Sequence, residues 1–420
     1  MRSPKVPMVG MFDEALPVSI DRTVAEKTRS DYLSENDGDT VTRRTLYTPE
    51  TPFAVVDQER MDRNITRLRS HLTTLDLTLR LHVKTAKSLE VAAHVFPDGP
   101  GPITVSTLAE AEHFADHGYD DILYAVGIAP HKLDRVIALR QRDVDLVVLI
   151  DSVPQALAVG DASRRSGNRI PALIELDCDG HRGGVAVDSS ELIAIAEALT
   201  AGGGELRGVL DHAGESYFSQ TSEQRLVDAT LERKTVADAA SHLNAAGFDC
   251  PVVSSGSTPT AHALDTAAGI TEVRAGNFVF FDLVMAGIGV CSVDDLALSV
   301  VVTVIGHRPD KGWIMTDGGW MATSRDRGTQ VQTVDQGYGL VATLDGRVIP
   351  DLIMTGASQE HGILAMRSDD AAPLPSLDIG TRLRILPNHA CATGAQHDRY
   401  EVVTGTDDEI VDTWERIRGW

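Results

Sequence analysis

Lys84 is the residue whose position points most directly to covalent chemistry. It follows an alternating apolar run, Leu79, Leu81 and Val83, that predicts a strand, and a helix-compatible segment (Ser88–Val95) comes next. A lysine at the carboxyl end of a strand that feeds a helix lies where βα units gather their catalytic groups. Partly removed from water, such an amine loses its proton readily and attacks a carbonyl to form a Schiff base. The sequence therefore favours Lys84 as a nucleophilic amine, with a solvated surface lysine as the alternative.

Two loops rich in small residues, Ser255–Thr258 and Gly276–Asn277, each follow a predicted strand. Backbone N–H groups in loops of this kind bind phosphate at the carboxyl ends of parallel strands. Ser-Gly runs are also ordinary turns, but a second loop on the neighbouring strand favours a phosphate site. A Schiff-base lysine together with a phosphate site describes a pyridoxal 5'-phosphate (PLP) site.

His389 and Cys391 have the side-chain types that bind zinc. If Pro387–Cys391 forms a strand, residues two apart project from the same face and can reach one ion together. Imidazole and thiolate suit zinc, and two protein ligands leave positions open for water or substrate. The alternative is that both side chains are buried packing residues.

The elements that must position these groups alternate regularly. From Leu79 to Arg274, eight short apolar segments are predicted as strands, with helical patterns between them. This order predicts an α/β fold with a closed parallel (β/α)8 TIM-like barrel. An open doubly wound sheet is disfavoured, because no Gly-rich dinucleotide turn follows the predicted strand Phe53–Asp57.

From Ser299 onward the predicted strands are joined by turns with almost no helix, which indicates an antiparallel β domain. We therefore expect three parts. Residues 1–50 form an N-terminal extension that packs with the β domain, and residues 51–298 form the PLP-binding barrel. Residues 299–420 form the β domain, which carries the metal ligands and closes with a short helix over Val411–Trp420.

Composition excludes several classes of protein. The 420 residues carry a formal net charge of -23, so no basic excess is present to neutralise nucleic acid or an anionic membrane. The four cysteines are scattered without a CxxC pair and are expected to be reduced thiols. Since the sequence has no apolar run of signal-peptide or membrane-spanning length, we expect a cytoplasmic protein.

Five motifs carry a resemblance that covers Thr51 to Val403. They are His82–Lys87, Gly180–Gly184, Ser255–Thr258, Arg274–Asn277 and Pro387–Cys391. A barrel and β domain with these motifs resembles the alanine racemase-like (fold type III) PLP enzymes. More closely, it is similar to the branch that holds D-serine dehydratase, D-threonine aldolase and D-3-hydroxyaspartate dehydratase.

The resemblance implies that Lys84 holds PLP and that His389 and Cys391 hold a catalytic divalent metal, with zinc favoured over manganese. It assigns cofactor contacts to Lys84, Arg182, His212, Tyr217, Ser255, Gly256, Ser257, Arg274, Gly276 and Asn277. Arg182 is expected to donate to the pyridine nitrogen, with Arg274 competing for that role. Because a guanidinium does not release its proton, the ring nitrogen stays largely unprotonated. A metal acting as Lewis acid on the substrate hydroxyl then becomes useful. For His212 and Tyr217, plain packing remains the alternative.

We therefore predict a lyase that acts on D-3-hydroxy amino acids. Cys391 favours a D-serine dehydratase-like reaction, which gives a 2-oxo acid and ammonia, over D-threonine aldolase-type cleavage to glycine and an aldehyde. A racemase would also use Lys84, but no tyrosine neighbours Pro387–Cys391 to act from the opposite face, which leaves Tyr338. A non-catalytic PLP-handling protein of this type would lack the β domain. The resemblance also implies a homodimer.

Overall fold

The computed structural model describes residues 43–368 and 373–420. Most of the predicted N-terminal extension, residues 1–42, lies outside the described residues. The predicted fold class is confirmed, since eight parallel strands close into a barrel and a separate sheet follows. None of the helices in the described ranges combines the length and apolar character needed to cross a membrane.

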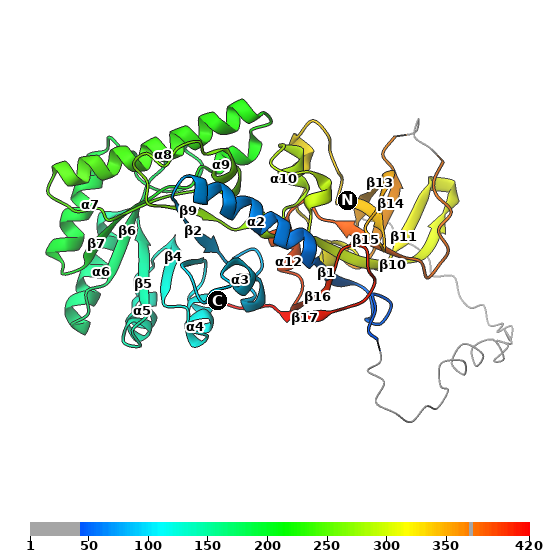
Figure 1. Ribbon diagram of the computed structural model, residues 1–420, viewed down its shortest axis with the longest axis horizontal. Coiled ribbons are helices and arrows are strands. Elements are labelled where there is room, and N and C mark those ends of the chain that lie inside the picture. The colour runs from blue at the N-terminus through cyan, green and yellow to red at the C-terminus, as the bar shows by residue number, and fades with distance from the viewer. Residues whose placement is uncertain (1–42, 369–372) are drawn as a thin grey trace, which may run out of the picture. The chain divides into compact units, whose positions relative to one another are not determined.

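The barrel runs in chain order from β2 to β9, and β9 pairs with β2 to close it. Its strands are β2 (Thr78–His82), β3 (Ile103–Val105), β4 (Asp121–Gly127), β5 (Asp145–Ile150), β6 (Pro171–Glu175), β7 (Glu205–Leu210), β8 (Val252–Ser255) and β9 (Glu272–Ala275). The connecting helices are α3 (Leu89–Val95), α4 (Leu108–Asp116), α5 (Leu133–Arg140), α6 (Val153–Ser166), α7 (Ser190–Ala201), α8 (Ser222–Ala245) and α9 (Thr258–Ala263). Figure 1 shows the long helices on the outside of the strands.

Side chains alternate along the barrel strands between the outer helices and the interior. On β2, Leu79 and Leu81 belong to the large core formed with the helices. Arg80, between them, forms ion pairs with Glu272 on the neighbouring β9 and with Asp121 at the start of β4. One side of the interior is apolar and is formed by Leu123, Val147, Leu149, Leu173 and Leu210.

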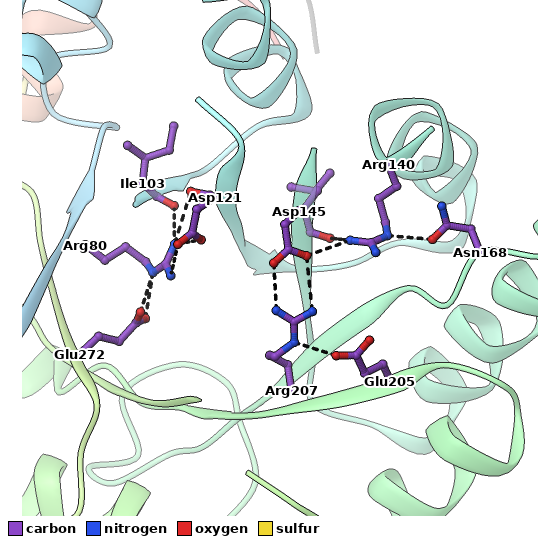
Figure 2. A network of polar contacts seen from close by, with 10 residues as sticks. Arg80, Ile103, Asp121, Arg140, Asp145, Asn168, Glu205, Arg207 and Glu272 are labelled. Atoms are coloured by element: carbon purple, nitrogen blue, oxygen red, sulfur yellow. Dashed lines mark hydrogen bonds and ion pairs between the residues drawn. The ribbon is translucent and has the colours of Figure 1, made fainter. Parts of the chain in front are cut away.

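The amino end of the barrel is closed by ion pairs (Figure 2). Asp121, Asp145, Glu205 and Glu272 are the first residues of β4, β5, β7 and β9. Arg80 binds Glu272 at 2.9 Å and Asp121 at 2.7 Å, and Arg207 binds Asp145 at 2.9 Å and Glu205 at 2.8 Å. Arg80 therefore links β2 to the neighbouring β9 and to β4, and Arg207 links β7 to β5 while also pairing within its own strand.

The second sheet has the order β11-β14-β13-β12-β15-β10-β1-β16-β17. Its strands are β1 (Phe53–Asp57), β10 (Leu298–Arg308), β11 (Trp313–Thr316), β12 (Leu340–Thr343), β13 (Val348–Ala357), β14 (Gly362–Met366), β15 (Arg382–Leu386), β16 (Arg399–Val403) and β17 (Asp412–Glu415). Three short helices accompany it: α10 (Leu283–Gly287) precedes β10, α11 (Trp320–Thr323) follows β11, and α12 (Ala390–Gly394) follows β15. We did not predict β13 and β14.

Strand β1 corrects the predicted domain division. Residues 51–298 were assigned to the barrel, but β1 pairs antiparallel with β10 and parallel with β16, inside the second sheet. In Figure 1 it lies beside the late strands of the chain. The chain then enters the barrel through α2 (Gln58–Thr74), whose first turn is capped by the Asp57 carboxylate. The sequence between Arg44 and Glu50 also meets this sheet, because Leu46 packs with Phe53 and Ile410.

The predicted C-terminal helix over Val411–Trp420 is wrong. This segment forms β17, which pairs antiparallel with β16 and places Trp414 opposite Tyr400. Trp414 is buried and its ring lies 5.2 Å from that of His94. A helix of about ten residues is marginal by itself, so the free edge of β16 and the buried indole decide the conformation.

Candidate active site

A cavity of about 560 Å³ lies at the carboxyl ends of the barrel strands. Almost all the predicted site residues line it, namely Lys84, Arg182, His212, Tyr217, Gly256, Ser257, Arg274, Gly276, Asn277, His389 and Cys391. Ser255 is the exception: it is buried and its hydroxyl donates to Glu232 at 3.0 Å. Its assignment as a cofactor contact stays a prediction. Residues that are far apart in the sequence thus line the same cavity.

Lys84 follows β2 and has an amine suited to nucleophilic attack. Burial lowers its pKa below the ordinary value for lysine, and the nearby Arg182 and Arg274 act in the same direction. The Cys391 thiolate opposes them, because it favours a charged ammonium. A larger fraction of Lys84 is therefore unprotonated near neutral pH than for a lysine in water.

The segment after Lys84 is held by the second sheet. Thr85 Oγ1 lies 3.2 Å from Cys391 Sγ, and the Tyr400 hydroxyl donates to the Ala86 carbonyl at 3.0 Å. Lys87 adopts a left-handed conformation, with φ at 49°, and forms a 2.7 Å ion pair with the buried Glu110. These contacts hold the backbone that follows Lys84 in place.

His389 and Cys391 lie together, although the reason we gave for it is wrong. They do not share a strand: His389 is the extended residue that precedes α12, and Cys391 belongs to its first turn. The two side chains interact directly, as the pKa of each depends on the other. The two side chains are therefore brought together by the start of a short helix, and not by a strand as we expected.

The charges on this pair suit a cation. Although burial opposes the shift, hydrogen bonds to Asp326 and Cys391 raise the pKa of His389 to about 11. Burial alone would raise the pKa of Cys391, but His389 and Lys84 lower it below the ordinary value for a thiol. A thiolate and an imidazole that now share a proton can instead bind a divalent ion, which displaces that proton.

Asp326 fixes the orientation of His389. Its Oδ2 lies 2.6 Å from His389 Nδ1, which leaves Nε2 as the nitrogen available to a metal. Within the described residues, no group of three or more histidine, cysteine or acidic side chains is arranged to hold an ion. His389 and Cys391 are therefore a pair of donors, one nitrogen and one sulfur.

The opposite wall of the cavity suits an anionic group. Thr258 Oγ1 and Asn277 Oδ1 are buried and have no hydrogen-bond partner among the described residues. Gly256 is also required there, because a Cβ atom would lie 2.2 Å from the Arg274 carbonyl and the residue has φ of 139°. The free Thr258 hydroxyl, which can donate, beside a close backbone approach fits the phosphate end of a cofactor, whereas Asn277 Oδ1 can only accept a hydrogen bond.

The two candidate arginines differ in how many donors they have free. Arg274 is buried and donates to Ser254 Oγ at 2.7 Å and to the Asp211 carbonyl. The Arg182 side chain is 60% exposed, and its ion pair with Glu175 measures 3.3 Å. Arg182 therefore keeps more donors for a bound molecule.

His212 is neutral, because burial and the charge of Lys84 lower its pKa to about 3. Its Nδ1 donates to the Gly256 carbonyl at 3.2 Å, so Nε2 carries the free lone pair. The Tyr217 ring lies 6.1 Å from the His212 ring, and burial raises the pKa of its hydroxyl. Both uncharged rings line the cavity.

Comparison with known families agrees with this arrangement. The model of the alanine racemase N-terminal domain matches residues 56–284, and that of a serine dehydratase domain matches residues 297–403. The chain belongs to the alanine racemase N-terminal domain family.

Within this alanine racemase-like family, the chain is 53% identical to D-threo-3-hydroxyaspartate dehydratase of Delftia sp. (strain HT23), over 90% of this chain and 99% of that protein. A solved structure of that enzyme superimposes with a TM-score of 0.86, at 52% identity over 90% of this chain and 100% of that chain. The chain is 26% identical to D-serine dehydratase of Dictyostelium discoideum, over 88% of this chain and 97% of that protein. It is also 26% identical to D-threonine aldolase of an Arthrobacter species, over 87% and 92%.

Sequence reasoning missed two residues of this alanine racemase-like site. Asp326 lies in the loop that follows α11, 63 positions before the histidine that it orients, so no local pattern marks it. Asp282 also lines the cavity and caps α10 by accepting from the Met285 amide. An aspartate directly before an apolar helical run is a helix-start signal, which would have located Asp282 without indicating its place in the site.

Proposed function

We propose that this chain is a PLP- and divalent-metal-dependent lyase that removes water from a D-3-hydroxy amino acid. The observation that carries the proposal is one cavity with a lysine of lowered pKa on its barrel wall and a His–Cys pair on its β-domain wall. The Delftia relative is a D-threo-3-hydroxyaspartate dehydratase, which supports a hydroxylated D-amino acid as substrate.

Residues of the barrel would hold the cofactor. When bound, PLP supplies an aldehyde that condenses with amines and a ring that withdraws electrons from Cα. Gly256, Ser257 and Asn277 line the wall that fits its phosphate, and Arg182 has the free donors to contact its ring nitrogen. Lys84 Nζ, partly unprotonated, is the base on this wall that can accept a proton.

Residues of the β domain would hold the metal. His389 and Cys391 supply one nitrogen and one sulfur ligand, a set that favours zinc and admits manganese less readily. Asp326 keeps the imidazole oriented. With two protein ligands, the ion retains positions for the substrate hydroxyl, where it would act as a Lewis acid on the bond to be broken. Two solved variants of D-threo-3-hydroxyaspartate dehydratase support this assignment. Alanine replaces a histidine in one and a cysteine two positions later in the other, which is described as metal-free.

Product analysis tests the reaction. The purified protein, supplied with PLP and zinc, is incubated with D-threo-3-hydroxyaspartate, D-serine and D-threonine, with the L-enantiomers as controls. We expect ammonia and a 2-oxo acid from at least one D-substrate, and none from its L-enantiomer. Glycine with an aldehyde would identify the aldolase reaction instead. This reaction is the second candidate, because the Arthrobacter relative is a D-threonine aldolase. Release of neither product pair would contradict the proposal.

We further propose a homodimer. Phe218 and Val126 line the cavity yet are 52% and 44% exposed, so apolar side chains remain uncovered at its mouth. Light scattering of the purified protein distinguishes a dimer from a monomer.

A further inference from the structure

Asp282 is a buried carboxylate that contacts both halves of the site. It is 1% exposed and belongs to the segment between η3 (Asn277–Val279) and α10. Its Oδ2 accepts from Asn277 Nδ2 at 2.6 Å and from the Ala390 amide at 2.9 Å. Its Oδ1 accepts from the Met285 amide at 3.0 Å. One side chain thus holds a residue of the barrel wall and the backbone between the two candidate metal ligands.

Backbone hydrogen bonds strengthen this connection. The Leu283 amide donates to the Pro387 carbonyl at 3.0 Å, and the Val284 amide donates to the Asn388 carbonyl at 3.2 Å. The start of α10 therefore lies along the segment that leads into His389. Any displacement of that segment would also move the carboxylate of Asp282.

Asp282 is poorly suited to be a metal ligand itself. Both of its oxygens already accept hydrogen bonds, and burial raises its pKa, although the charge of His389 opposes this. Its amide partner, Asn277, has its Nδ2 committed to Asp282, while its Oδ1 has no partner among the described residues. Asp282 therefore fixes the rotation of an amide on the wall that fits the cofactor phosphate.

We propose that Asp282 is a positioning residue that makes PLP and the metal bind cooperatively. This inference rests on the proposed function. A metal on His389 and Cys391 orders the backbone at Ala390, which holds Asp282 and through it Asn277. PLP then binds to residues that are already ordered, so less conformational entropy is lost on binding. The same holds for the metal when PLP binds first.

The test measures both affinities on the purified full-length protein. PLP is titrated by its absorbance with and without saturating zinc, and zinc is titrated against a chromophoric chelator with and without PLP. We expect each ligand to raise the affinity for the other by the same factor, on the order of tenfold. In Asp282→Asn, one hydrogen-bond acceptor becomes a donor, so both affinities should fall and the factor should approach one.

Asp57→Asn is the matched control. Asp57 is 2% exposed, caps α2 and accepts from the amides of Arg60 and Gly405, both at 3.2 Å. It lines no part of the cavity. This variant should lose stability and keep both affinities and the coupling factor, which separates a general packing defect from the proposed role.

Asn277→Ala is a second variant that removes only the barrel side of the connection. Zinc affinity without PLP should stay at the wild-type value, while the coupling factor falls to one. The inference is overturned if wild-type protein binds both ligands independently, or if Asp282→Asn and Asn277→Ala keep the wild-type factor. Failure of the wild-type protein to bind PLP or zinc at all would instead overturn the proposed function.

Discussion

The two ends of the barrel use charge in opposite ways. At the amino end, Arg80 and Arg207 each bind two carboxylates, and the charged groups of Figure 2 are matched with partners. Although burial opposes it, Arg207 and Arg140 lower the pKa of Asp145 there. At the carboxyl end, burial raises the pKa of Glu175, and burial with the charge of Glu232 raises that of Asp211 to about 8.

This difference indicates that the amino end of the barrel contributes mainly to stability and the carboxyl end mainly to reactivity. Matched pairs contribute to stability by joining strands, and their removal leaves a buried charge without a partner. Groups with displaced pKa values and unpaired polar atoms cost stability, and they gather where a ligand can pair with them. We therefore expect variants at the amino end to lose stability with activity retained, and variants at the carboxyl end to do the reverse.

The largest expected effect is at Lys84. Lys84→Ala removes the amine that we propose binds the cofactor covalently and accepts a proton, so turnover should fall at least about 10³-fold. Its thermal midpoint should stay close to that of the wild type, because a buried amine with a displaced pKa contributes little to stability. The measurement is 2-oxo acid formation together with a thermal melt. Lys234→Ala, on the exposed face of α8, is the control; equal activity of the two variants would contradict the assignment of Lys84.

The next effect tests the amino end. Arg80→Met leaves the buried Glu272 without its ion-pair partner, so the free energy of unfolding should fall by about 3 kcal/mol, roughly a 150-fold change in the folding equilibrium. Urea unfolding measures it. Arg142→Met, which breaks an exposed pair with Asp116, should cost at most about 0.5 kcal/mol. A loss of turnover per folded molecule in Arg80→Met would contradict the proposal that the amino end serves stability and the carboxyl end serves activity.

A smaller effect is expected at Asp326. Asp326→Asn keeps the shape of the side chain but weakens its bond to His389 Nδ1, so affinity for zinc should fall by about 10- to 100-fold. Activity should recover at raised zinc concentration, which a plain folding defect would not allow. The measurement is activity against free zinc after chelation. Unchanged zinc dependence would show that the orientation of His389 does not matter for binding.

The sequence predicted the parts of this molecule that depend on local pattern. Alternating runs such as Leu79–Val83 marked the barrel strands, and Lys84 stood out because it directly follows one. The parts that depend on distant pairing were missed or misplaced. Nothing near Phe53–Asp57 reveals that its partners are Val301 and Glu401, and Asp326 meets His389 only in the folded chain. His389 and Cys391 were found from their chemistry, while their local conformation was wrong because a proline-led pentapeptide does not determine it.

The position of β1 has a consequence for synthesis and for protein engineering. Val55 pairs with Ser299 on one side and Glu401 on the other, so the central part of the second sheet joins the start of the described chain to its end. In a nascent polypeptide β1 has no partner until β10 has been synthesised, and its second edge stays open until β16 follows. Cutting the gene near codon 298 would likewise leave a sheet that lacks an interior strand. The second sheet is therefore completed last, and a fragment that begins near residue 298 would lack one of its interior strands.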